Sequence, residues 1–185
     1  MYFEETPLRG SFIVDLDLRE DDRGFFARYF CHEEFTNVGL NARWLQANNS
    51  MSRTRGTLRG LHFQRPPHAE VKLIRCVRGA IWDVAVDLRH NSETFGKWFG
   101  VTLTETNRKM FYVPRGFAHG FVSLEDNTEI TYLVSDFYTP SAEGTVNWND
   151  PDVAIEWPLD PLFISQKDKN GGAIRDLTPL IIDDQ

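Results

Sequence analysis

Two stretches of the sequence combine polar residues whose types could transfer protons. The first runs from Arg59 through His62 to Gln64, and Lys72 follows within the apolar run Val71 to Val77. Histidine suits general acid-base catalysis because its charge changes near neutral pH, although a lone histidine in a strand more often has a structural role. A lysine inside an apolar strand is costly to bury unless it is paired or used. The pattern therefore predicts a polar-lined cavity, with His62 and Lys72 as candidates for chemistry.

The second stretch, Pro114 to His119, places a turn before a strand that carries His119. Together with His62 and Glu70, this histidine could supply a three-ligand metal site. Transition-metal sites of this pattern usually offer His-x-His, but here the second position is Gln64, and glutamine is a poor ligand for a transition metal. The sequence favours a site without metal and leaves the three-ligand alternative open.

Arginines near these stretches are candidates for binding phosphate groups, because a guanidinium can hold two phosphate oxygens at once. Arg23 lies in a turn-like segment rich in aspartate, where a surface salt bridge is the stronger interpretation from position alone. In a regular strand Arg59 and His62 would point to opposite faces, unless a bulge at Gly60 realigns them. No glycine-rich phosphate loop of the dinucleotide-binding or NTPase type is present.

Composition limits the classes of protein to which the chain could belong. Its 185 residues, 41% of them hydrophobic, are enough for one core, and the formal net charge of -7 argues against a general nucleic-acid or anionic-membrane surface. No run of about 18 apolar residues occurs, and the two cysteines do not form a C-x-x-C motif. We expect a single domain over residues 1–185 in the reducing cytoplasm.

The elements that must position these residues are predicted to be short strands. Apolar or alternating runs separated by turn signals are typical of a sandwich or barrel, and they span Ser11–Leu18, Phe25–Phe30, Leu58–Phe63, Val71–Val77, Ala80–Asp87, Lys97–Leu103, Lys109–Val113, His119–Ser123 and Thr128–Ser135. Glu33–Val38 is the best candidate for an early helix. From about Asn149 onward, four prolines interrupt every long element, so we expect a tail that wraps the barrel.

Taken together, these segments resemble the dTDP-4-dehydrorhamnose 3,5-epimerase family of RmlC-type cupins. The matching motifs extend over nearly the whole chain and include Asp22-Arg23-Gly24, Gln46-x-Asn48-x-Ser50-x-Ser52, Leu58-Arg59-Gly60-Leu61-His62-Phe63-Gln64, Lys72-Leu73, Asp83-Val84, Pro114-x-Gly116-Phe117-Ala118-His119-Gly120-Phe121, Tyr132, Tyr138-x-Pro140, Trp148-Asn149-Asp150-Pro151 and Ser165-x-Lys167-Asp168. The resemblance implies an all-β cupin-type double-stranded β-helix, or jelly roll, with short flanking helices. It also implies a homodimer with exchanged N-terminal strands and a reaction without metal or other cofactor.

The resemblance further implies epimerisation of a nucleotide-linked 4-keto-6-deoxyhexose, most simply dTDP-4-dehydro-6-deoxy-D-glucose. Hydrogens on C3 and C5 lie next to the C4 ketone, so a base can remove them if the enolate oxygen is stabilised. By this analogy His62 is the base, Asp168 orients its imidazole and Lys72 stabilises the enolate. Tyr132 is then the acid that protonates the opposite face of the ring.

The same analogy implies a set of residues that hold the substrate. They are Arg23 and Arg59 at the phosphates, Gln46 and Asn48 along the nucleotide and sugar, His119 at the sugar or its enolate, and Phe26 and Tyr138 as walls for the nucleoside. Arg28 is expected nearby, where family members commonly have glutamate. This difference favours the alternative that the chain inverts a single carbon or uses a CDP- or GDP-linked sugar.

Overall fold

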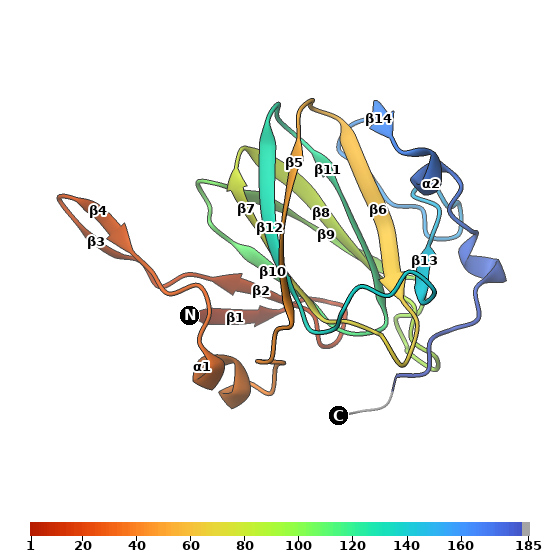
Figure 1. Cartoon of the computed structure of the whole chain (residues 1–185), viewed down its shortest axis with the longest axis horizontal. Helices are drawn as coiled ribbons and strands as arrows, with labels where there is room; N and C mark the ends of the chain where they lie inside the picture. The colour runs from red at the N-terminus through yellow and green to blue at the C-terminus, as the bar shows by residue number, and fades with distance from the viewer. Residues whose placement is uncertain (183–185) are drawn as a thin grey trace.

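The computed structural model describes residues 1–182 and consists mainly of antiparallel strands in two facing sheets (Figure 1). The first sheet contains, in spatial order, β1 (Tyr2–Glu5), β2 (Phe12–Asp15), β10 (Met110–Val113), β7 (Lys72–Arg78), β12 (Thr128–Val134) and β5 (Gln46–Ser52). The second contains β13 (Glu143–Thr145), β6 (Thr57–Gln64), β11 (Phe117–Ser123), β8 (Ala80–Asp87) and β9 (Trp98–Thr104), and β14 (Phe163–Ile164) joins the edge of β6 in parallel.

The order of the strands is that of a jelly roll. From β5 to β12 the chain crosses from one sheet to the other at nearly every connection, so that consecutive strands rarely pair. The short helices α1 (His32–Asn37) and α2 (Gln166–Lys169) and the 3₁₀ turn η1 (Ile174–Asp176) flank the sheets. The predicted all-β class with short flanking helices is therefore confirmed. The last three residues of the domain expected over residues 1–185 lie outside the described residues.

Several predicted strand boundaries were wrong near the N-terminus. The strand expected over Ser11–Leu18 is only β2, and most of Phe25–Phe30 lies outside any strand. Instead, β3 (Arg19–Asp21) and β4 (Gly24–Phe26) form a separate hairpin that pairs with no other strand. The polar segment Gln46–Ser52 was not predicted to be a strand, yet it pairs along its whole length with β12. Long-range pairing outweighs its weak intrinsic preference for a strand.

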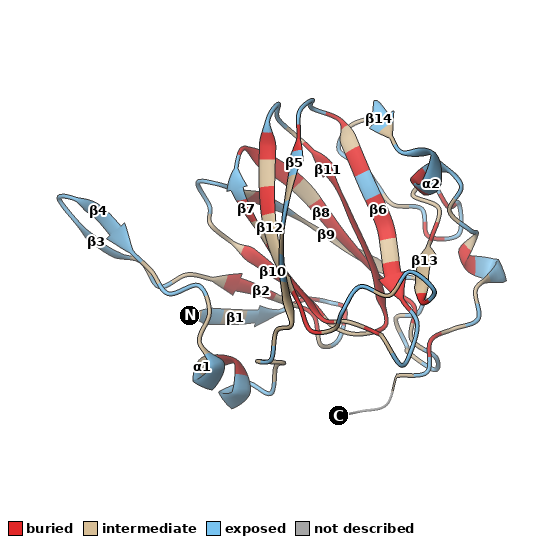
Figure 2. Cartoon of the chain, in the orientation of Figure 1, coloured by how far each residue is buried: buried red, intermediate tan, exposed pale blue. Residues whose placement is uncertain are grey.

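Three apolar clusters hold these layers together. The first fills the space between the sheets and includes Ile74, Leu103 and Phe111. The second lies on the outer face of the second sheet, where side chains of the tail such as Val153, Ile174 and Leu180 cover the strands, and the third lies under α1 around Phe35. Figure 2 shows the buried residues concentrated in the strands and the hairpin β3–β4 exposed throughout.

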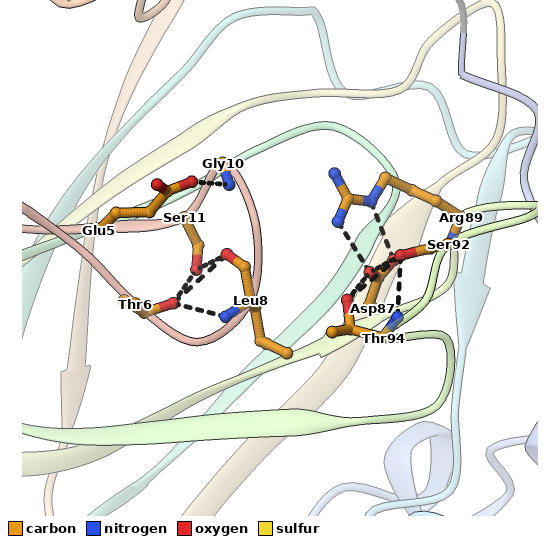
Figure 3. A network of polar contacts seen from close by, with 9 residues as sticks. All are labelled: Glu5, Thr6, Leu8, Gly10, Ser11, Asp87, Arg89, Ser92 and Thr94. Atoms are coloured by element: carbon orange, nitrogen blue, oxygen red, sulfur yellow. Dashed lines mark hydrogen bonds and ion pairs between the residues drawn. The ribbon is translucent and has the colours of Figure 1, made fainter.

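Figure 3 shows two groups of polar contacts, one around Thr6 and Ser11 between β1 and β2 and one around Asp87. Asp87 at the end of β8 accepts hydrogen bonds from Arg89 and from the hydroxyls of Ser92 and Thr94. Burial alone would raise the pKa of Asp87, but these donors hold it below its usual value. These bonds lie within the loop between β8 and β9, and in the β1–β2 turn Thr6 and Ser11 bond to one another.

Candidate active site

A bulge in β6 brings Arg59 and His62 to the same side of the second sheet. Gly60 has a φ of +117°, and a side chain there would begin only 2.6 Å from the Cα of Gly120. The pairing of β6 with β11 shifts register at this point, so His62 lies opposite His119 while Arg59 lies opposite Phe121. The bulge at Gly60, which the sequence allowed as an exception to regular alternation, is therefore present. The side chains of Arg59 and His62 both face the space between the sheets.

His62 forms a close pair with Asp168, a residue 106 positions later in the chain. Its Nε2 lies 2.6 Å from Oδ1 of Asp168, whose second oxygen accepts a 3.4 Å hydrogen bond from the amide of Gly60. Asp168 is only 3% exposed because α2, capped by Ser165, folds back against β6. Burial alone would raise the pKa of Asp168, but the hydrogen bond and charge of His62 lower it, so the carboxylate is ionised at neutral pH.

Lys72 and Tyr132 belong to the opposite sheet and face His62 across the interior. Lys72 is buried, and its Nζ lies 3.1 Å from Oε1 of Glu70, which supplies the counter-charge that a buried ammonium needs. Burial, together with the negative charge of Glu70, raises the pKa of Tyr132. Its phenol therefore carries its proton at neutral pH, as an acid must before it donates.

A second histidine-carboxylate pair, formed by His119 and Asp83, was not predicted. Nε2 of His119 lies 2.7 Å from Oδ1 of Asp83, and the other oxygen of this fully buried carboxylate has no hydrogen-bond partner among residues 1–182. Burial raises the pKa of Asp83, while the nearby His119 and Lys72 oppose that effect. The sequence did contain a signal for this pair, because Asp83 is the one carboxylate inside the apolar run Ala80–Val86. A buried carboxylate requires a partner of opposite charge or a hydrogen-bond donor.

These residues surround a cavity of about 610 Å³, a size typical of small-molecule sites. The second sheet provides Arg59, His62 and His119, and the first sheet provides Lys72, Tyr132 and Ser50. The tail closes one side with residues from Leu162 to Lys169. The arrangement places a base with its carboxylate on one wall and a protonated phenol with an ammonium on the other. Such a site can remove a proton from one face of a ligand and return one to the other face.

Three residues expected to bind substrate, Arg23, Phe26 and Arg28, do not reach this cavity in their own chain. Arg23 lies at the tip of the β3–β4 hairpin, its side chain 89% exposed and paired with Asp21, and Phe26 is 63% exposed. Arg28 follows the hairpin and lies 3.6 Å from Glu34. Figure 1 shows the hairpin projecting away from the barrel. The single chain alone therefore does not assemble the full set of residues.

The other three expected contacts, Gln46, Asn48 and Tyr138, do not line this cavity. Oε1 of Gln46 accepts a 2.8 Å hydrogen bond from the amide of Tyr138, whose hydroxyl donates to Glu143. Asn48 on β5 lies directly opposite Tyr132 in the ladder. The ring of Tyr138 is 57% exposed and free to contact a ligand outside the barrel. Gln46 and Asn48 lie on the same face of β5 as Ser50, which lines the cavity.

The residues of the alternative metal site do not form one cluster. His62 is bonded to Asp168, His119 to Asp83, and Glu70 to Lys72. Within residues 1–182, no group of three or more histidine, cysteine, aspartate or glutamate side chains is arranged to hold a metal ion. None of the helices described in this range is long and apolar enough to cross a membrane.

Comparison with known proteins identifies sugar epimerases, among them several dTDP-4-dehydrorhamnose 3,5-epimerases and a 3'-monoepimerase. A family model described as dTDP-4-dehydrorhamnose 3,5-epimerase matches residues 5–176. The enzyme of that name from Methanothermobacter thermautotrophicus is 46% identical over 177 residues, which cover 94% of this chain and 95% of the relative. The structure of the Elizabethkingia anophelis enzyme superposes with a TM-score of 0.92 at 44% identity, covering 95% of this chain and 97% of that one. A dTDP-6-deoxy-D-glucose-3,5-epimerase from Legionella pneumophila, in complex with dTDP-4-keto-L-rhamnose, superposes with a TM-score of 0.92 at 34% identity over 99% of both chains.

Proposed function

The chain belongs to the dTDP-4-dehydrorhamnose 3,5-epimerase family, and we propose that it converts dTDP-4-dehydro-6-deoxy-D-glucose to dTDP-4-dehydro-L-rhamnose by inverting C3 and C5. The observation that carries the proposal is the His62–Asp168 pair on one wall of the cavity with Tyr132 on the opposite wall. Inversion needs a base and an acid on opposite faces of the sugar ring. Two groups on one wall would return the proton to the face from which it came.

His62 removes the hydrogen from a carbon next to the C4 ketone. Asp168 keeps the imidazole oriented and stabilises the imidazolium that forms, in the manner of a catalytic histidine-carboxylate pair. The electrons move toward the ketone oxygen and give an enolate. Lys72, which is bonded to Glu70 through one of its three possible donor hydrogens, lines the cavity and can donate another to that oxygen. His119, held by Asp83, is the second group able to do so.

Tyr132 then delivers a proton to the opposite face of the carbon. The phenol faces the cavity from β12, whereas His62 faces it from β6 in the other sheet. Because its pKa is raised, the phenol is neutral before transfer. The same two groups serve both carbons, so His62 must release its proton to solvent and Tyr132 must regain one before the second inversion.

The test of the proposal is deuterium incorporation followed by NMR in deuterated buffer. With dTDP-4-dehydro-6-deoxy-D-glucose we expect deuterium at both C3 and C5 and conversion to the L-rhamno configuration. Incorporation at one carbon alone would replace the proposal with a single-carbon epimerase. Incorporation only with the CDP-linked analogue would make Arg28 the first residue to examine for nucleotide choice. Absence of exchange with either nucleotide sugar would refute epimerase activity on these substrates.

The exposed hairpin supports a further part of the proposal, that the enzyme is a homodimer. β3 and β4 pair only with each other, while β5 is an edge strand of the first sheet and carries Ser50 at the cavity. Exposed edges and projecting hairpins are the features by which one chain adds strands to another. We propose that the hairpin of a second copy docks near β5 and brings Arg23 and Phe26 to the cavity of its partner.

Mixing two defective subunits tests this arrangement. One subunit carries His62→Ala and the other carries Arg23→Ala with Phe26→Ala, and each homodimer is expected to lose at least about tenfold in activity. A heterodimer purified through two different tags contains one intact site if the hairpin acts on the partner. It should then recover about half of the wild-type activity per dimer. If the heterodimer is as inactive as the two variant homodimers, the hairpin of one subunit does not contribute to the cavity of the other.

A further inference from the structure

A second cavity lies at the end of the first sheet where β10 and β12 finish and β7 begins. It is a groove of about 1270 Å³, and within residues 1–182 it shares no lining residue with the catalytic cavity. Tyr112, Val71 and Ser135 line it. In the ladders Leu73 lies between Tyr112 and Leu133, so Val71 and Ser135 lie two positions further along on the same face. Three neighbouring strands therefore present their outer face to this groove.

Two buried hydroxyls in this groove accept hydrogen bonds from the backbone. The amide of Asn41 donates a 3.0 Å bond to Tyr112, and the amide of Val71 donates a 2.8 Å bond to Ser135. Tyr112 is 4% exposed and Ser135 is 8% exposed, and neither hydroxyl donates its own hydrogen to any acceptor in residues 1–182. Burial raises the pKa of Tyr112, so its phenol keeps that hydrogen at neutral pH. The groove therefore contains two donors that the described chain leaves unused.

The segment that carries Arg43 crosses the groove from one strand to another. Asn41 is bonded to Tyr112 of β10, and the amide of Leu45 donates a 2.8 Å hydrogen bond to the carbonyl of Val134 at the end of β12. Arg43 lies midway between these two anchors and lines the groove. In the part of the chain that the structure describes, its guanidinium has no ion pair or hydrogen bond. A guanidinium beside two unused hydroxyl donors favours an anionic ligand.

The charged groups that line the groove come from several loops. The cationic residues are Arg9, Arg43, Arg89 and Arg115, and the acidic residues are Glu93 and Asp136. Arg89 is already paired with Asp87, and Arg115 donates a 3.1 Å hydrogen bond to the carbonyl of Ala69. With the Arg89–Asp87 pair set aside, positive charge still exceeds negative charge in the groove, although the whole chain carries a formal charge of -7.

We propose that this groove binds the phosphate group of a small organic phosphate, at a site separate from the catalytic cavity. A phosphate has several acceptor oxygens in a tetrahedral arrangement, which can take hydrogens from Tyr112 and Ser135 and a bidentate contact from Arg43. A carboxylate has two oxygens in one plane and matches fewer of these directions. The volume of the groove exceeds that of the catalytic cavity, so it has room for the organic part of the ligand.

The test is a titration with ribose 5-phosphate at constant ionic strength, followed by NMR of the backbone amides. The protein carries Arg59→Ala, which removes a guanidinium from the catalytic cavity. The amides of Asn41 and Val71 report on the groove because they are bonded to its two hydroxyls. We expect both signals to follow one saturating curve with a dissociation constant of about 1 mM or lower. Shifts that do not saturate, or that exclude both amides, would overturn the proposal.

A matched pair of variants separates a defined site from general attraction to positive charge. Arg43→Met should weaken binding of ribose 5-phosphate at least about fivefold, because a charge-assisted hydrogen bond is lost. Arg53→Met removes the same charge from an exposed arginine that lines neither cavity, and it should leave the dissociation constant within about twofold. Equal weakening in the two variants would refute a site at Arg43.

Two further probes test the chemical class of the ligand. Inorganic phosphate should shift the amides of Asn41 and Val71, whereas malonate should bind at least about fivefold more weakly than inorganic phosphate. Malonate that binds as tightly would overturn the assignment of the groove to phosphate. None of these titrations contains a nucleotide sugar, so their outcome is independent of whether the chain is an epimerase.

Discussion

His62→Ala is expected to abolish deuterium incorporation at C3 and C5 together. Both hydrogens are acidic for the same reason, their position next to the ketone, and the described cavity contains one histidine bonded to a carboxylate of the tail. Loss of a general base costs roughly 10²–10⁴-fold in rate. We expect a loss in this range at both carbons, measured by NMR from the initial rate of exchange.

Two companion variants sharpen the interpretation of His62. Asp168→Asn keeps the shape of the partner but cannot stabilise the imidazolium, so it should slow exchange at both carbons in equal proportion. His32→Ala is the control, because His32 is exposed at the start of α1 and does not line the cavity. Full activity of His62→Ala would refute the mechanism, and loss at only one carbon would require a second base, for which His119 is the nearest candidate.

Tyr132→Phe is expected to separate proton exchange from inversion. His62 can still remove the hydrogen and return a solvent-derived proton to the same face, which regenerates the substrate with deuterium in place. Without the phenol the opposite face lacks its donor, because β12 provides this hydroxyl from the sheet opposite β6 (Figure 1). We expect isotope exchange to continue while formation of the inverted product falls by roughly 10²-fold or more.

The measurement compares deuterium content with configuration in the same sample, by NMR couplings of the ring protons. Tyr112→Phe is the matched control, because Tyr112 is also buried with a raised pKa but bonds to the amide of Asn41, away from the catalytic cavity. It should invert the sugar at the wild-type rate. Normal inversion by Tyr132→Phe would show that another group, or water, protonates the second face.

The candidate site could be predicted only in part from the sequence. His62, Lys72 and His119 were identifiable because polar side chains within apolar strands need a partner or a use. The face of β6 on which Arg59 lies depended on the bulge at Gly60, which local periodicity allowed but did not require. Asp83 had no assigned role, since the identity of its partner depends on the pairing of β8 with β11.

Assignments made through family resemblance fall into two groups. The jelly roll and the family are confirmed by the strand order and the comparisons. The roles of the individual residues stay predictions, and Arg23, Phe26 and Arg28 lie outside the cavity of their own chain. The resemblance alone does not show whether the hairpin β3–β4 contacts the cavity of its own chain. That depends on the direction in which the hairpin projects from the barrel.

The sequence by itself determined which side chains could do chemistry and the strand-rich class of the fold, because residue types and short apolar runs act locally. Only the tertiary structure decided how distant residues meet. It joined Asp168 to His62 across 106 positions and placed Tyr132 on the facing sheet. The physical reason is that strand register and the docking of the tail arise from contacts summed over many segments, which no single segment encodes.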